Sequence, residues 1–402
     1  MDLDRVELNN WLAEFSDSKR SAGGLPAMRK LCEYFGHPEN ACPCFHVAGS
    51  KGKGTISASI ASILSAAGYK VGVYGSPHVL HFTERVRLAD GLFPEEIYQA
   101  AEKELKTGIA DILSQGIIPK KALTWSRLVN LFAMLCFRAS KVDFAVYEVG
   151  VGGRLDSTNV ISPICIAMGP IELEHTKFLG DTLTKIATEK SGVFKPSVPV
   201  ISSPQPEEVK NVFTTAAKAN STTVTYVPQA EYQVIDAKIA ELAAKIALPT
   251  LDKKTIKSGL EQVSLPARYE IIKNLANFPS LPYLFLDGAH TVNSFKAVLG
   301  RMQKDGIRGN LLFGCAADKN VKEIAKLILD SGLFNKIYLT KPGDFKKSDL
   351  ESMKEAFDGK AYFASPDFEK TIQKALTDSS TEGLPLITLG SFYLAGEVKK
   401  LI

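Results

Sequence analysis

The sequence lacks the features that mark membrane, secreted and nucleic-acid-binding proteins. Among its 402 residues, no apolar run approaches the roughly 18 residues of a membrane-spanning helix. Its first stretch, "MDLDRVELNNWLAEF", is acidic and amphipathic, unlike a secretory signal or a transit peptide. The net charge of +4 is spread along the chain without a block of like charge or a basic tail. We therefore expect a cytoplasmic protein that binds neither nucleic acid nor membranes.

Cysteine is also scarce and scattered. The six cysteines are Cys32, Cys42, Cys44, Cys136, Cys165 and Cys315. Only "CPC" at 42–44 is close-set, and the ring of Pro43 makes chelation of one metal by both thiols unfavourable. The spaced pairs of a zinc site are absent. We expect reduced thiols with structural roles, as is usual in the cytosol.

What the sequence does contain is an alternation of strand-like and helix-like segments. Its length exceeds one ordinary hydrophobic core and favours two domains. Helices are predicted near 4–16 and 25–36, separated by the turn "SAGG". Strands are then expected over 44–49, 70–76, 142–150, 163–169 and 198–203, and helices over 55–68, 94–105 and 125–140. This order predicts an α/β fold with a doubly wound, mostly parallel sheet.

The alternation breaks at 264–282, where "SLPARYEIIKNLANFPSLP" holds three prolines and no clean period. Beyond it, short strands are expected over 283–288, 309–314, 336–340, 360–364 and 384–390, each followed by a helix-like segment. We therefore predict a first domain over 1–270 and a smaller Rossmann-like α/β domain over 280–402.

A glycine-rich stretch, "HVAGSKGKGT" at 46–55, lies between a predicted strand and a predicted helix, the usual context of a phosphate-binding loop. Gly49, Gly52 and Gly54 allow positive φ and close backbone approach, so successive N–H groups can point at phosphate oxygens. Lys53 would neutralise the β- and γ-phosphates of ATP, and the Thr55 hydroxyl would bind Mg²⁺. In the usual P-loop the hydroxyl directly follows the lysine, whereas here Gly54 intervenes. The alternative is a flexible basic turn.

Two further polar residues follow strands of the same predicted sheet. Glu148 ends the strand in "VYEVGVGGRLDSTN", and His175 follows the next strand in "GPIELEHTKFLGDT". Alone, the first could be a cap and the second a structural histidine. Ligands of open α/β sheets bind at the carboxyl ends of the strands, so Thr55, Glu148 and His175 converge on one edge. Two oxygens and an imidazole suit Mg²⁺ or Mn²⁺.

The predicted second domain has a comparable group of residues. In "LFLDGAHT", Asp287 and His290 follow its first strand, and Arg268 stands just before the junction between the two predicted domains. If the two domains share one active site, these groups would line it from the far side.

In their order along the chain, the motifs resemble those of the folylpolyglutamate synthase/dihydrofolate synthase family, the folate branch of the Mur-ligase superfamily. They are "HVAGSKGKGT", "YGSPHVLHFTERVRL", "YEVGVGGRLDSTNV", "LEHTKFLGDTLTKIATEKSGVFK", "LPARYEII", "LDGAHT", "GCAADKNV" and "GSFYLAGEV". The resemblance spans most of the chain and is weakest across about 205–263 and 342–384. The family loop is G-T-N-G-K-G-[ST], which accounts for the displaced hydroxyl. The resemblance implies an N-terminal P-loop ATPase domain, a C-terminal Rossmann-like domain and ATP-dependent ligation of L-glutamate to a folate carboxylate through an acyl phosphate.

The resemblance also implies roles for individual residues. The ATP contacts would be Gly49, Ser50, Lys51, Gly52, Lys53, Gly54, Thr55, Arg268 and Asp287. The metal ligands would be Thr55, Ser76, Glu148 and His175, and catalytic roles would fall to Lys53, Lys190 and His290. The folate contacts would be His78, Phe82, Arg85, Arg154 and Asp156. Lys190 matches a lysine that is carbamylated in the superfamily; the alternative is an exposed helix lysine. The implied ions are Mg²⁺ at two sites, with Mn²⁺ as an alternative and K⁺ as a monovalent ion.

The chain departs from the family pattern at a few positions. Lys51 stands where the family has asparagine, and Glu174 replaces the aspartate of L-D-H. Ala267 replaces the glycine of P-G-R, and Thr291 replaces the asparagine of D-G-A-H-N. None of these changes removes an expected metal ligand or the loop lysine.

Several functions remain in competition. Within the family we favour a bifunctional enzyme that uses dihydropteroate and tetrahydrofolate polyglutamates, because "GGRLDSTN" resembles the bifunctional type. A peptidoglycan Mur ligase would need a UDP-binding domain before the loop, where only about 45 residues stand. A nucleotide-binding module without catalysis is the remaining alternative. The family is usually monomeric, so a monomer is expected.

Overall fold

The computed structural model describes residues 2–15, 24–344 and 347–402, and it divides into two compact units, Met1–Val263 and Ser264–Ile402. Most of the expected turn "SAGG" lies outside the described residues. The boundary between the units falls at the start of the segment predicted as a junction. Across the described part of the chain, no helix combines the length and apolarity needed to cross a bilayer.

The first unit alternates strands and helices as the sequence predicts. Its strands are β1 (Cys44–Ala48), β2 (Val71–Tyr74), β3 (Val86–Leu88), β4 (Phe144–Glu148), β5 (Cys165–Met168), β6 (Val200–Ser202) and β7 (Val224–Tyr226). Its α-helices are α1 (Val6–Ala13), α2 (Gly24–Tyr34), α3 (Lys53–Ala66), α4 (Glu95–Ser114), α5 (Trp125–Ser140), α6 (Thr176–Leu179), α7 (Leu183–Ser191), α8 (Glu207–Ala219), α9 (Tyr232–Ala247) and α10 (Lys253–Glu261). Short 3₁₀ helices are η1 (Pro38–Asn40), η2 (Phe82–Arg85), η3 (Lys120–Ala122) and η4 (Ser157–Val160).

The sheet of this unit is seven-stranded, in the order β3-β2-β4-β1-β5-β6-β7, and every pair is parallel except β2–β3. This confirms the predicted doubly wound, mostly parallel fold. β3 and β7 were not expected from the sequence, because these short edge strands are only partly buried and lack the apolar run that marks the equally short β6. β1 lies at the centre and is buried throughout, as a strand covered on both faces must be.

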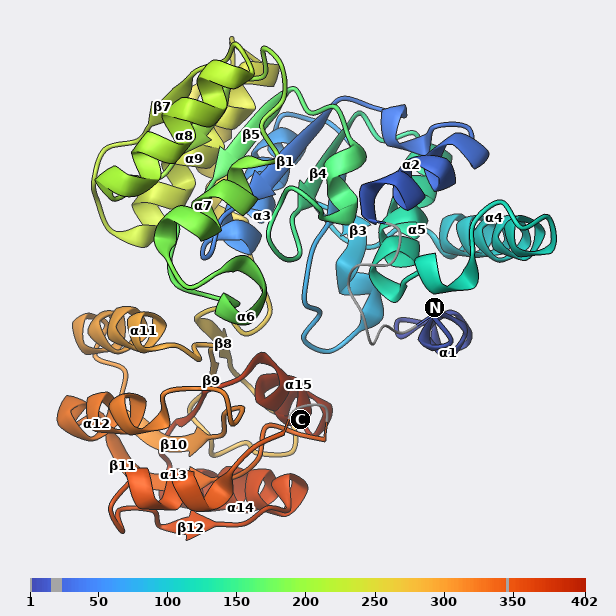
Figure 1. The fold of residues 1–402 in the computed structure, drawn as a ribbon. Helices are drawn as coiled ribbons and strands as arrows, with labels where there is room; N and C mark the ends of the chain where they lie inside the picture. The colour runs from blue at the N-terminus through green and yellow to red at the C-terminus, as the bar shows by residue number, and fades with distance from the viewer. Residues whose placement is uncertain (1, 16–23, 345–346) are drawn as a thin grey trace. The chain divides into compact units, whose positions relative to one another are not determined.

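Helices cover both faces of this sheet (Figure 1). On one face, Phe45 and Val47 of β1 pack with apolar residues of α3, α9 and α10. On the other face, Cys44 belongs to a core built with α2, α4 and α5, and Ala48 to a core built with α7 and α8. Alternate residues of β1 therefore face different helices, as the two-residue period of a strand requires.

The helix that follows the glycine-rich stretch is held by a close helix–helix contact. α10 lies against α3 at Gly259, where an added Cβ would be 2.6 Å from the Cα of Ile63. The Ser62 hydroxyl donates a hydrogen bond of 2.6 Å to the Gly259 carbonyl. Because the neighbouring atoms are backbone, the contact has no room for a side chain.

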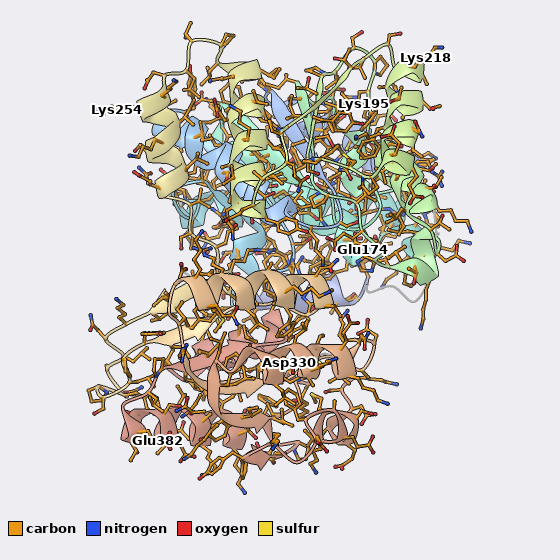
Figure 2. The ribbon with its side chains drawn as sticks, turned by 90° about the vertical axis from the view of Figure 1, so that its left-hand side faces the viewer. Glu174, Lys195, Lys218, Lys254, Asp330 and Glu382 are labelled. Carbon is orange, nitrogen blue, oxygen red and sulfur yellow. The ribbon has the colours of Figure 1, made fainter. Side chains whose placement is uncertain are left out.

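The second unit carries a six-stranded sheet in the order β12-β11-β10-β13-β9-β8, with only β8–β9 antiparallel. Its strands are β8 (Glu270–Ile272), β9 (Leu284–Leu286), β10 (Gly309–Phe313), β11 (Phe334–Leu339), β12 (Phe363–Ala364) and β13 (Leu386–Leu389). Its helices are α11 (Val292–Lys304), α12 (Val321–Ser331), α13 (Leu350–Ala356), α14 (Phe368–Glu382) and α15 (Phe392–Lys400). Figure 2 marks α12 by Asp330 and α14 by Glu382. The predicted strands and the last helix are present, and β8 adds a short edge strand within the segment where the sequence shows no period.

We predict opposite effects for two glycine-to-alanine substitutions in helices. Gly259→Ala should lower the free energy of unfolding by about 1–3 kcal/mol, because the methyl group overlaps the α3 backbone. Gly300→Ala, at an exposed position of α11 with no atom within 4 Å of the new Cβ, should raise it by about 0.5–1 kcal/mol. Urea unfolding measures both, and equal signs for the two variants would contradict the packing described for α10.

Candidate functional site

The glycine-rich loop joins β1 to α3 and contains two residues in conformations that favour glycine. Gly49 has φ 137° and Gly52 has φ 75°, and α3 begins at Lys53. A Cβ on Gly49 would lie 2.8 Å from the Cα of Gly169 at the end of β5. Conversely, a Cβ on Gly169 would lie 2.2 Å from the Lys51 carbonyl oxygen. Gly169 is therefore a structural partner of the loop that sequence reasoning missed.

Ser50 fastens the loop to the segment after β5. Its N–H donates to the Pro170 carbonyl at 2.8 Å. Its hydroxyl donates to the Glu172 carbonyl at 3.1 Å and accepts from the Glu172 N–H at 3.0 Å. Because Ser50 is only 4% exposed, these bonds are shielded from water and hold the loop in one conformation.

Two lysines donate to the same loop carbonyl. Lys53 Nζ lies 3.1 Å from the Gly49 oxygen, and Lys190 Nζ lies 2.7 Å from it. Lys190, on α7, is only 1% exposed, so the alternative of an exposed helix lysine is wrong. Burial first, and then the charge of Lys53, lowers the pKa of Lys190 to about 8.

Glu174 neutralises part of this positive charge. Its carboxylate lies 2.8 Å from Lys190 Nζ, and Figure 2 labels it in the segment that follows β5. Burial would raise the pKa of Glu174, but Lys53 and Lys190 outweigh burial and hold this pKa below its ordinary value. The family has the shorter aspartate here, and in this chain the longer side chain forms the ion pair with Lys190.

The expected metal ligands all follow strands that are neighbours in the sheet. Ser76 follows β2, Glu148 ends β4, Thr55 follows β1 and His175 follows β5, and the sheet order is β2-β4-β1-β5. Since these strands are parallel, their carboxyl ends share one edge.

Contacts within this set join two of its members. The Ser76 N–H donates to Glu148 Oε2 at 3.1 Å, and Glu148 is 5% exposed. His175 is exposed, with φ 47°, at the start of α6. A group of three or more histidine, cysteine, aspartate or glutamate residues fit for a metal does not occur in the part of the chain that the structure describes. The expected set of metal ligands contains only two residues of these types, Glu148 and His175, and the hydroxyls of Thr55 and Ser76 complete it.

The loop after Glu148 is closed by Asp156. One oxygen of this carboxylate accepts from the N–H groups of Gly150 at 3.1 Å and Val151 at 3.2 Å, and the other accepts from Thr158 N at 3.0 Å. The carboxylate expected to contact folate is thus used largely within its own loop. Arg154, on the same loop, pairs with Glu189 of α7 at 2.8 Å.

The segment after β2 forms an aromatic and basic cluster with α5. Arg85 Nε donates to His78 Nδ1 at 2.7 Å, and its guanidinium lies 4.8 Å from the centre of the Trp125 ring. Phe82 is 1% exposed, so its ring supports the cluster from the core and does not face solvent. Burial and the charge of Arg85 lower the pKa of His78 to about 4. Half-buried Trp125 was missed in the sequence, although an aromatic residue right after the helix cap Thr124 was a usable signal.

In the second unit, the expected residues gather around Phe392. The Arg268 guanidinium lies 4.9 Å from the centre of this ring, and the His290 ring lies 6.0 Å from it. A Cβ on Gly288 would lie 2.4 Å from the Phe392 ring. Asp287 accepts from the N–H groups of Tyr269 and Ala289, both at 2.8 Å. Burial raises the pKa of Asp287 above its ordinary value despite these bonds.

The structure shows the local effect of two departures from the family pattern. Ala267 has φ 53° and is fully buried, a left-handed conformation that glycine adopts without strain. Thr291 caps α11, since its hydroxyl accepts from Ser294 N while the Ser294 hydroxyl accepts from Thr291 N. A threonine can therefore replace the family's asparagine as a helix cap.

Comparison with known proteins finds relatives and similar structures over most of the chain. No protein-family model matches the chain. The dihydrofolate synthase/folylpolyglutamate synthase of Escherichia coli is 29% identical over 342 residues, which cover 78% of this chain and 77% of the relative. The protein of the same name from Bacillus subtilis is 26% identical over 422 residues, covering 94% of both chains. The solved structure "E.coli FolC in complex with DHPP and ADP" is similar with a TM-score of 0.82 and 26% identity, covering 98% of this chain and 97% of that one.

Over most of its length the chain is therefore similar to members of the folylpolyglutamate synthase/dihydrofolate synthase family. The fold agrees with that of Lacticaseibacillus casei folylpolyglutamate synthase in its apo form, with a TM-score of 0.84 at 23% identity over 99% of each chain. The predicted family, fold class and activity as an ATP-dependent ligase are confirmed. The roles of single residues and the joint use of the two units stay predictions.

Ala267 leads to a prediction about stability. Ala267→Gly relieves about 1–2 kcal/mol of left-handed strain but loses about 0.8 kcal/mol of methyl burial and about 0.4–1 kcal/mol through the freer unfolded chain. The net change in unfolding free energy should stay within about 1 kcal/mol. Ala325→Gly, at a buried position of α12, should lower the free energy of unfolding by about 2 kcal/mol, because a helical alanine has no left-handed strain to relieve. Equal losses in urea unfolding would contradict the strain at Ala267.

Lys190 leads to a prediction about pH. Its folded-state pKa of about 8 lies below the ordinary 10.5, so the unfolded chain binds more protons between these values. The stability of the wild type relative to Lys190→Met should therefore rise from pH 8 towards pH 10.5. Urea unfolding of both proteins at pH 7.5 and 9.5 in bicarbonate-free buffer checks this. Identical pH dependences would show that Lys190 is not buried in the folded protein.

Proposed function

We propose that this protein joins L-glutamate to the carboxylate of a folate-type acceptor at the expense of ATP. The observation that carries the proposal is the phosphate loop after β1, held by Gly49 and Gly169 and lined by Lys53, within a chain of this family. The acceptor carboxylate attacks the γ-phosphorus and releases ADP. The glutamate amine then attacks the acyl carbon, phosphate leaves with its electron pair, and the amine proton is lost.

The loop residues serve the first step. Backbone N–H groups at the start of α3 and the charge of Lys53 bind the phosphates and stabilise negative charge as the phosphoryl group moves. Lys53 already donates to the Gly49 carbonyl, so its ammonium is positioned at the loop before ATP binds. The relative solved with ADP supports ATP as the nucleotide.

The edge that carries Thr55, Ser76 and Glu148 fits Mg²⁺. Two hydroxyls and a buried carboxylate are the oxygen donors that this ion prefers, and His175 would add an imidazole. Bound there, Mg²⁺ would neutralise charge on the phosphate oxygens. Two magnesium sites remain part of the proposal, as does Mn²⁺ as a substitute.

Lys190 is proposed to react with carbon dioxide and supply an anionic carbamate beside the loop. The reaction needs the neutral amine, and a pKa of about 8 leaves a larger neutral fraction near pH 7 than an ordinary lysine has. Glu174, which holds the ammonium form at 2.8 Å, would have to release it.

The acceptor is proposed to bind over the Asp156-closed loop and the cluster of His78, Arg85 and Trp125. A half-buried indole offers a flat surface for an aromatic ring system, and Arg85 and Arg154 offer positive charge for carboxylates. We propose a bifunctional enzyme that accepts both dihydropteroate and tetrahydrofolate, as the names of the Escherichia coli and Bacillus subtilis relatives suggest.

We propose that residues of the second unit take part in the reaction and that the protein acts as a monomer. Arg268 and Asp287 would contact the nucleotide, and His290 would act near the acyl phosphate and the incoming glutamate. The ring of Phe392 lies beside both residues and would hold the guanidinium of Arg268 and the imidazole of His290 in place.

An assay of ADP release tests the function. Wild-type protein with ATP, Mg²⁺, L-glutamate and dihydropteroate or tetrahydrofolate should release ADP and incorporate labelled glutamate with each acceptor. Lys53→Ala should lower this rate by at least about a hundredfold, because a charge aimed at the transferring phosphoryl group is lost. Lys218→Ala, an exposed lysine on α8, serves as control and should keep the wild-type rate.

The outcomes separate the alternatives. ATP binding without glutamate-dependent ADP release would favour the non-catalytic module. Activity with tetrahydrofolate alone would remove the dihydropteroate half of the proposal. Full turnover by Lys53→Ala would contradict the role of the loop.

A further inference from the structure

A fully buried histidine lies in the central strand beside the proposed acceptor loop. His46 is 0% exposed, in β1 between Tyr147 of β4 and Ile166 of β5. Its neighbours Phe45 and Val47 face α3 and α9, so His46 faces the opposite side of the sheet. Every other side chain of β1 is apolar or a thiol, and an imidazole there is unfavourable unless its polar atoms are satisfied.

The imidazole takes part in a chain of hydrogen bonds that ends in the loop. His46 Nε2 lies 2.9 Å from the Thr158 hydroxyl oxygen, and this hydroxyl donates to Asp156 Oδ1 at 2.6 Å. A hydroxyl has one hydrogen, and a carboxylate can only accept. The hydrogen on the first bond must therefore belong to His46, which makes it the Nε2–H tautomer.

The surroundings of His46 are consistent with a neutral donor. Burial first, and then the charge of Lys195, lowers the pKa of His46 to about 3, so the ring is uncharged at neutral pH. Lys195, labelled in Figure 2, donates to the Asn159 carbonyl at 2.9 Å. Among the described residues, none forms a hydrogen bond with His46 Nδ1, so the contact with Thr158 is the ring's one polar anchor.

The loop that contains Asp156, where this series of hydrogen bonds ends, is closed on two sides. Asp156 binds the N–H groups of Gly150 and Val151 on one side and Thr158 on the other. Asn159 Nδ2 donates to the Arg154 carbonyl at 3.1 Å and to the Gly192 carbonyl at 3.0 Å. The position of Arg154 and of Leu155, which is 56% exposed, thus depends on Thr158 and its neighbours.

We infer that His46 is a positioning residue for the acceptor: through Thr158 it fixes the Asp156-closed loop to the central strand and so sets where Arg154 and Leu155 meet the substrate. The inference rests on the proposed function, because it takes this loop as part of the acceptor site. It adds a link between the strand that carries the phosphate loop and the loop that carries the acceptor. Because His46 is fully buried, its effect on specificity is exerted through Thr158.

Steady-state kinetics test the inference with four variants. His46→Leu removes the donor at similar volume, His46→Gln keeps an N–H donor at similar reach, and Thr158→Val removes the hydroxyl that links His46 to Asp156. His46→Leu and Thr158→Val should each raise the KM of the faster acceptor, dihydropteroate or tetrahydrofolate, about tenfold, the usual effect of one lost buried hydrogen bond. The KM of ATP should stay within about twofold, and His46→Gln should recover most of the loss. The double variant His46→Leu/Thr158→Val should be no worse than either single one, because both break the same chain.

Three results would overturn the inference. They are an unchanged acceptor KM in His46→Leu, equal increases in the KM of ATP and of the acceptor, and additive effects in the double variant. A wild-type enzyme without glutamate-dependent ADP release would remove the proposed function and this inference with it, whereas an active wild type with a normal His46→Leu variant removes the inference alone.

A spectroscopic measurement keeps the inference testable if His46→Leu fails to fold. Two-bond ¹H–¹⁵N correlations of the wild-type imidazole should show the Nε2–H tautomer, and the same signal should change in Thr158→Val. A ring protonated on Nδ1 would contradict the hydrogen-bond chain.

Discussion

The contact between Gly49 and Gly169 is the constraint on which the rest of the site depends. Neither residue has room for a Cβ, so the phosphate loop lies directly on the end of β5. This places the Gly49 carbonyl where Lys53 and Lys190 can both reach it. The ammonium groups of Lys53 and Lys190 thus share one acceptor although they repel each other. The carboxylate of Glu174 beside Lys190 reduces the free-energy cost of this repulsion. The proposed phosphate-binding loop is in this way held in one conformation by contacts within the protein itself.

The sheet order extends this arrangement to the other polar groups. The central strand β1 lies between β4 and β5, so the loop after β1 has Glu148 on one side and the segment of Glu174 and His175 on the other. The polar groups cluster because parallel strands all end at the same edge, not because they are near in sequence. His46 and Thr158 then join this edge to the loop after β4 from within the sheet.

Two of the four departures from the family pattern are matched by local compensation. Glu174 uses its extra methylene to reach Lys190, and Thr291 replaces an amide cap with a hydroxyl cap. Ala267 retains strain that a glycine would avoid, and it gains the burial of one methyl group and a less flexible unfolded chain. Lys51 has no such explanation in the contacts described for the loop.

By itself, the sequence determined the order of most strands, the helices of the first unit up to α5, the loop at Gly49–Thr55 and the family resemblance, because these depend on local periodicity and on motifs of fixed spacing. β3, β7 and β8 could not be predicted, since these short edge strands are only partly buried and lack the apolar run that marks the equally short β6 and β9. Only the tertiary structure decided that Lys190 is buried, that Phe82 belongs to the core and that Asp156 closes its own loop. Burial and side-chain partners are set by residues far apart in the chain, such as Gly49 with Lys190 and His46 with Thr158, and no local pattern encodes which of them will meet.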